Sequence, residues 1–117
     1  MTVQSKIPVI QVDVSVDAAS GNIICQPNPL PVNVPNAMIV FGLSTSGYAF
    51  PNQDAIVLDT PDPSFPFSSW TIHPNQANLL DRCSQPGLFD YTVNVIETAT
   101  GRVLSVDPQI QNGTAQP

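Results

Sequence analysis

Thirteen prolines and six glycines are spread over the 117 residues of the chain, and these frequent helix-breaking residues limit its fold more than any other feature. Proline lacks the amide hydrogen that a helix interior needs, and glycine costs a helix about 1 kcal/mol relative to alanine. Long helices therefore have almost nowhere to form. The segments between these breakers have the length of β-strands, so the sequence predicts an all-β chain of short strands.

Two segments show the two-residue period of a strand with one buried face. Residues 10–16 alternate isoleucine or valine with Gln11, Asp13 and Ser15, and residues 89–95 alternate aromatic residues and valines with polar ones. Residues 23–25 are expected to pair back on the first strand. Residues 103–106 are expected to form a hairpin with the second, through the turn at Thr100-Gly101.

Other segments complete the predicted sheets. Residues 37–43 form an apolar run typical of a strand buried on both faces, residues 55–58 form a short strand, and residues 70–72 re-enter the core. Prolines at 27, 29, 31 and 35 confine residues 32–34 to a sheet edge. One or two helical turns are expected within residues 75–83, with Leu79 and Leu80 facing inward.

These elements predict a two-sheet antiparallel sandwich, similar to immunoglobulin or cupredoxin domains, with about seven or eight strands and at most one short helix. Residues 1–117 have the length of one domain, and their 42% hydrophobic content is enough for a core. Residues 1–6 and 113–117 are expected to be flexible ends.

The charge of the chain argues against two classes of partner. Nine acidic residues outnumber the three basic ones, Lys6, Arg82 and Arg102, and the net charge is −6. Such a chain repels phosphate, so neither nucleic acid nor an anionic membrane is expected as a partner. No signal peptide or membrane span is visible, which favours a cytoplasmic location.

Cys25 and Cys83 fit no CxxC spacing for metal or redox chemistry. Two interpretations remain open from the sequence. The cysteines form a disulfide if the compartment is oxidising, or they are free thiols that pack as small hydrophobic side chains.

Polar candidates for chemistry are few. His73 is the only histidine, and a metal site would need Cys25, Cys83 or an aspartate beside it, at no recognisable spacing. Asp54, Asp59 and Asp62 could meet a calcium ion, although solvated loop carboxylates are the simpler interpretation. With no paired catalytic groups and no cofactor motif, we expect neither an enzyme nor a cofactor.

Four aromatic residues and one sequence triplet are further candidates. Tyr48 and Phe50 lie in a loop-like segment and are candidates for contact with a partner, whereas Phe65 and Phe67 are expected to plug the end of the sandwich. The triplet 112–114 matches the N-glycosylation pattern, which acts only on a secreted chain.

The C-terminal third resembles two known families. Residues 87–93 are similar to the penultimate strand of cupredoxins, with Val93 at the position of the copper-binding cysteine. A blue-copper site also needs two histidines, which this chain lacks. The run Phe89-x-Tyr91-x-Val93-x-Val95, continued by Gly101 and Asp107-Pro108-x-Ile110-x-Asn112, resembles the bacterial DP-EP family of small sandwich proteins of unknown function. This resemblance covers residues 86–112 and implies a fold but no activity.

Two function hypotheses follow. The first is a non-catalytic binding or structural module that meets another protein, or its own copy, through loops or a strand edge. The alternative is a metal-binding, cupredoxin-derived protein with His73 and Cys83 as the residues to test.

Overall fold

The computed structural model describes residues 7–113, which form eleven strands and no helix. The strands are β1 (Val9–Asp17), β2 (Asn22–Gln26), β3 (Leu30–Val32), β4 (Ala37–Leu43), β5 (Tyr48–Ala49), β6 (Ile56–Leu58), β7 (Trp70–His73), β8 (Gln76–Asp81), β9 (Gly87–Glu97), β10 (Val103–Val106) and β11 (Gln109–Asn112). The predicted all-β fold is confirmed. Residues 7–113 also contain no helix that could cross a membrane.

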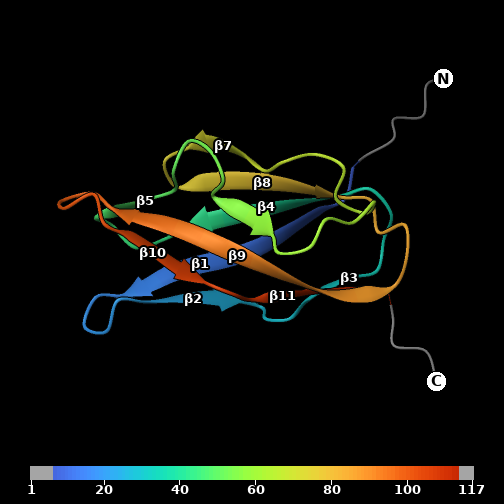
Figure 1. Cartoon of the computed structure of the whole chain (residues 1–117), viewed down its shortest axis with the longest axis horizontal. Helices are drawn as coiled ribbons and strands as arrows, with labels where there is room; N and C mark the ends of the chain where they lie inside the picture. Colours follow the sequence, from blue (N-terminus) through green and yellow to red (C-terminus); the bar gives the residue numbers. More distant parts are fainter. Residues whose placement is uncertain (1–6, 114–117) are drawn as a thin grey trace.

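The strands form two sheets that pack as a sandwich (Figure 1). Sheet I has the order β2-β1-β4-β8-β7. Sheet II has the order β10-β9-β11-β3, with β5 and β6 also paired to β9. Both sheets are mixed, because β1 pairs with β4 and β11 pairs with β3 in parallel. The predicted two-sheet sandwich is therefore confirmed, although its sheets are mixed instead of antiparallel throughout.

The proline-rich segment between β2 and β4 explains the parallel pairs. Its chain leaves sheet I after β2, adds the short edge strand β3 to sheet II, and returns to sheet I as β4. This crossing brings β4 to the free side of β1 in the same direction. A hairpin would have returned it in the opposite direction.

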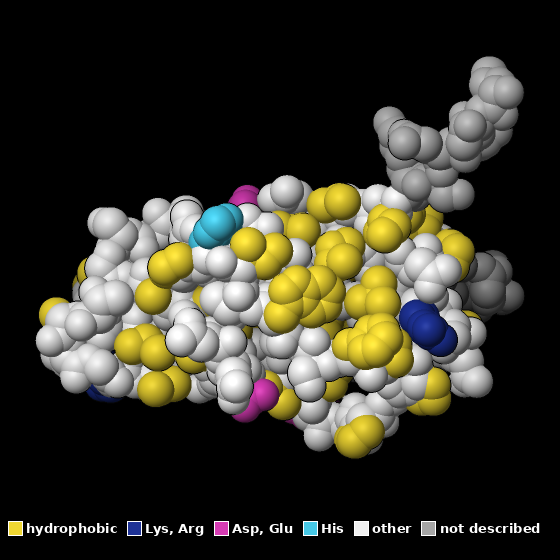
Figure 2. All heavy atoms as spheres, turned by 90° about the horizontal axis from the view of Figure 1, so that it is seen from above, with side chains coloured by type: hydrophobic (Ala, Val, Ile, Leu, Met, Phe, Trp, Pro, Cys, Tyr) yellow, Lys and Arg dark blue, Asp and Glu magenta, His cyan; other side chains and the backbone are white. Residues whose placement is uncertain are grey.

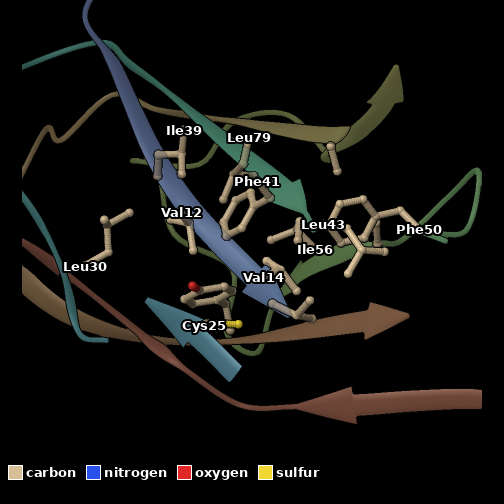
Figure 3. Packing of buried hydrophobic residues seen from close by; sticks show 14 of the residues in the cluster. Val12, Val14, Cys25, Leu30, Ile39, Phe41, Leu43, Phe50, Ile56 and Leu79 are labelled. Carbon is tan, nitrogen blue, oxygen red and sulfur yellow. The ribbon is translucent and has the colours of Figure 1, made fainter. Parts of the chain in front are cut away.

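The core lies between the sheets, where the two strongest sequence patterns meet (Figure 3). Val12 and Val14 of β1 are fully buried, as are Val93 and Val95 of β9, so both predicted strands and their buried faces are confirmed. In the middle of the core, Phe41 of β4 contacts Tyr91 of β9 edge to face, with ring centroids 5.7 Å apart. The predicted hairpins β1–β2 and β9–β10 are also present.

The helical turns expected within residues 75–83 are absent, because residues 76–81 form strand β8 between β4 and β7. Ala77 and Leu79 point into the core, whereas Gln76 lies on the outer face. The adjacent leucines at 79 and 80 fit either a helix or a strand locally. Pairing with strands on both sides outweighs the few tenths of a kcal/mol by which helix propensities differ.

Two further expectations need correction. Trp70 does not re-enter the core: it lies on edge strand β7 and is 38% exposed. Strand β4 is buried on its inner face but only half-buried on its outer face.

The predicted flexible ends 1–6 and 114–117 lie outside the described residues. Gly113, the first residue of the predicted flexible C-terminal end, instead donates its amide hydrogen to the Val32 carbonyl at 2.8 Å.

Candidate functional site

His73 and Cys83 lie at opposite ends of the β7–β8 hairpin. His73 pairs with Gln76 at the start of β8, whereas Cys83 follows Asp81 at the end of that strand. The extended chain from 76 to 83 spans roughly 20 Å, too far for one metal ion to bridge. Within residues 7–113, no three histidine, cysteine or acidic side chains are grouped so as to hold a metal ion.

Both cysteines are free thiols in the structure. Cys25 lies in the core, where burial raises the pKa of its thiol to about 11. Cys83 is half-buried, and its thiol donates a weak hydrogen bond to the Val32 carbonyl at 3.4 Å. Of the two interpretations left open by the sequence, this arrangement corresponds to packed thiols.

Phe50 and Phe67 lie in the opposite environments to those predicted. Phe50 is only 3% exposed and packs in the core (Figure 3), so it is not available to a partner, and Tyr48 is half-buried against the same core. Phe67, which was expected to plug the sandwich, is instead 58% exposed. Phe65 does pack inward, edge to face with Phe89 at a centroid distance of 5.3 Å.

The exposed Phe67 borders a hollow of about 240 Å³ beside strand β6. The hollow is lined by Asp54, Ile56, Val57, Leu58, Phe65, Pro66, Phe67, Ser68, Ser69 and Leu79. The buried Ser69 hydroxyl fixes one wall by accepting a hydrogen bond from the Ile56 amide at 3.2 Å. The lining combines aromatic, proline and aliphatic side chains with the polar Asp54, Ser68 and Ser69, so the hollow can receive a group that has both an apolar body and a polar edge.

Large apolar side chains are exposed around this hollow. Val57, which also lines it, is 37% exposed, and Trp70 and Ile72 on the adjoining strand β7 are 38% and 47% exposed. We call Val57, Phe67, Trp70 and Ile72 the upper apolar surface. Strand β7 lies at the top of Figure 1, and hydrophobic side chains gather on the face seen from above in Figure 2.

The backbone edge of β7 is less suited to binding than its side chains. Within the described residues β7 pairs with β8 alone, but its ladder is broken by a bulge between Thr71 and His73, and Pro74 follows directly. Short, bulged edges that end at proline resist the addition of another strand. Contacts at this surface are therefore expected to use side chains.

A buried polar pair joins the two sheets at the opposite end of β8. Asn112 of β11 donates its amide to Asp81 Oδ1 at 2.9 Å, and the Cys83 amide donates to the same oxygen at 2.8 Å. Both Asp81 and Asn112 are fully buried, yet Asp81 Oδ2 and Asn112 Oδ1 have no partner among the described atoms. Burial raises the pKa of Asp81, opposed by these two hydrogen bonds.

The remaining polar candidates lie apart. The Thr92 hydroxyl lies 2.8 Å from Asp59 Oδ1 and 2.7 Å from Asp107 Oδ1. Asp59 is therefore held beside Asp107 and not beside Asp54 and Asp62, as the predicted calcium site would need. Of the N-glycosylation triplet, Asn112 is fully buried and therefore inaccessible in the folded protein, and residue 114 lies outside the described chain.

Comparisons with known proteins add no family assignment. No protein-family model and no curated protein matches this chain.

Proposed function

We propose that this protein is a non-catalytic binding module and that the upper apolar surface is its contact with a protein partner. The observation that carries the proposal is the exposure of Phe67, Trp70 and Ile72 around the hollow beside strand β6. Folded monomers rarely leave large apolar side chains clustered on their surface unless the cluster binds something. Aromatic residues, and tryptophan above all, are also enriched where protein interfaces gain most of their energy.

The hollow gives such a partner an anchoring point. A partner side chain inserted beside Phe67 would lose its exposure to water, and fully burying one large apolar side chain contributes about 1.5–3 kcal/mol. The net charge of −6 opposes association with acidic proteins and with a second copy of the chain. The partner class is therefore a neutral or basic protein with an exposed apolar or aromatic side chain.

We also propose membership in the DP-EP family, on the motif run from Phe89 to Asn112. This family resemblance leaves the binding function unchanged. The alternative of a metal protein lacks support, since the fold holds its two test residues at opposite ends of a hairpin.

A peptide-display selection on the immobilised protein tests the binding proposal. Selected peptides are expected to carry an aromatic or aliphatic anchor with basic neighbours, and to bind Phe67→Ser at least tenfold more weakly, a loss of about 1.4 kcal/mol. Val103→Ser is the matched control, because Val103 is also 58% exposed but lies on β10. Its affinity is expected to match the wild type.

Two results would contradict the proposal. One is a selection that yields no peptide above background. The other is a set of peptides that bind Phe67→Ser as tightly as the wild type, which would place the contact elsewhere on the molecule.

A further inference from the structure

A second hollow, of about 310 Å³, lies on the outer face of sheet I. Strands β1, β4 and β8 form its floor, and we call it the Gly42 groove. It is lined by Gln11, Asp13, Val40, Gly42, Leu43, Ser44, Asn75 and Gln76. None of these lining residues belongs to the upper apolar surface, although Trp70 of that surface stands on the same outer face of sheet I.

Gly42 lies in this groove without a structural reason to be glycine. Its φ is not in the left-handed region, and a Cβ atom built on it would meet nothing within 4 Å. Glycine within a strand costs roughly 0.5–1 kcal/mol relative to alanine, and it often marks a point where a ligand approaches the backbone closely. The fold would accept a side chain here, so the open floor favours an occupant.

The width of the groove limits the size of that occupant. Asp13 of β1 and Gln76 of β8 are the direct neighbours of Gly42 on either side. Adjacent strands lie about 4.8 Å apart, so these two flanking residues stand about 10 Å from each other across the bare glycine. That spacing admits one six-membered ring with its substituents.

The lining chemistry defines the class of ligand. The side chains of Gln11, Asn75 and Gln76 offer amide donors and acceptors, and Asp13 and Ser44 add a carboxylate and a hydroxyl. Gln76 Nε2 already donates to Asn78 Oδ1 and Ser44 Oγ to the Val14 carbonyl, each at 3.4 Å, whereas among residues 7–113 no hydrogen bond engages the side chains of Gln11 and Asp13. The described lining contains no lysine or arginine, and Asp13 repels anions.

An aromatic side chain stands at one end of the same face. In sheet I, Trp70 pairs with Asn78, and Asn78 pairs with Val40. Val40 also pairs with Gln11, so the four residues form one row across the sheet. Trp70 is 38% exposed in this row. Trp70 does not line the groove itself, but a ligand that extends across Asn78 would reach its indole ring, which can cover the apolar face of a hydroxylated ring.

From this combination we infer that the Gly42 groove binds a neutral, hydroxyl-rich ring, namely a hexopyranose unit of a carbohydrate. Anionic ligands lack a cation to pair with. An apolar peptide would leave the amide groups of the lining unpaired on burial, which costs about 1–3 kcal/mol per group.

The experiment is a titration of the full-length, isotope-labelled protein, followed by amide NMR shifts. The probes are the methyl glycosides of glucose, galactose, mannose and N-acetylglucosamine, together with maltose, cellobiose and lactose. At least one sugar is expected to cause saturable shifts in the side-chain amides of Gln11, Asn75 and Gln76 and in the backbone amide of Gly42. A panel that causes no saturable shift, or shifts confined to other surfaces, overturns the inference.

Variants decide whether the groove is responsible. Gly42→Val fills the hollow and is expected to fold with unchanged or higher stability and to abolish the shifts. Ser15→Val is the matched control, because Ser15 lies on the same face of β1 outside the lining residues, and it should bind as the wild type does. Asp13→Ala leaves the hollow open and should weaken binding, so it decides the question if Gly42→Val does not fold. A sugar that binds both groove variants unchanged would refute the site.

Discussion

Replacing Tyr91 by phenylalanine should leave this protein as stable as before or make it more stable, although removing a buried tyrosine hydroxyl normally destabilises a protein. Tyr91 is fully buried between the sheets, and its hydroxyl has no hydrogen-bond partner among the described residues. Burial raises the pKa of this phenol above its ordinary value, with the nearby Cys25 thiol adding to the effect. The hydroxyl therefore gives up its hydration on folding and receives little in return.

The size of the effect follows from two opposing terms. An unsatisfied buried polar group costs about 1–3 kcal/mol, and Tyr91→Phe removes that cost. The lost oxygen leaves roughly 10 Å³ of empty space, which at about 24 cal/mol per Å³ costs only about 0.2 kcal/mol. The net expectation is a gain of about 1 kcal/mol, or roughly 4 °C in Tm for a chain of this length.

Urea unfolding followed by far-ultraviolet circular dichroism measures this change. Tyr48→Phe is the control, because Tyr48 is only half-buried and its replacement should stay within about 0.5 kcal/mol of the wild type. Phe41→Ala, which removes the ring that packs on Tyr91, should cost about 3–5 kcal/mol and so confirms that the assay detects changes in the core. A loss of 1 kcal/mol or more in Tyr91→Phe would refute the reasoning, since it would mean that the hydroxyl is hydrogen-bonded in the folded protein.

Three further predictions concern single residues. Burial raises the pKa of Asp81, so the folded state binds a proton on this carboxyl group more tightly than the unfolded chain does. The contribution of Asp81 to the free energy of unfolding therefore grows as the pH falls through its folded pKa towards its unfolded pKa. Asp81→Asn mimics the protonated form and should be more stable than the wild type at pH 7, with the difference shrinking as the pH falls through the raised folded pKa of Asp81. Urea titrations at several pH values that show a constant difference would contradict this. Iodoacetamide at pH 8 should alkylate the half-buried Cys83 in the native protein and should spare the buried Cys25 until urea is added. If mass spectrometry finds that neither thiol reacts in urea, the two cysteines form a disulfide instead. Gly113→Ala should lower the free energy of unfolding by more than about 1 kcal/mol, because φ at Gly113 is +73° and an added Cβ would lie 3.0 Å from the Pro86 side chain. An unchanged Tm in thermal unfolding would show that the backbone of this turn adapts.

Much of the framework could be predicted from local pattern. Strands β1 and β9 follow from an alternation that only a strand with one buried face satisfies, and the β9–β10 hairpin follows from Thr100-Gly101, where Gly101 has the positive φ of +77° that its turn requires. The same pattern predicts that Val12, Val14, Val93 and Val95 are buried, because a two-residue period assigns each side chain to one face.

The candidate sites could not be predicted in the same way. Phe50 and Phe67 lie in similar proline-containing segments, and only the packing of each segment made the first a core residue and the second a surface residue. The Gly42 groove depends on Asp13 and Gln76 being brought to either side of Gly42 by the sheet register. No residue within five positions of Gly42 in the sequence indicates that neighbourhood.

For strands β1 and β9, the sequence by itself determined where the strand forms and which face it buries, since the two-residue period acts over a few residues. Only the tertiary structure decided that residues 76–81 are a strand, that two strand pairs are parallel, and that Asp81 is buried against Asn112. The β4–β8 pairing, the two parallel pairs and the Asp81–Asn112 hydrogen bond all join residues about 30 or more positions apart. The free energies of such contacts outweigh the small conformational preferences that a local sequence expresses.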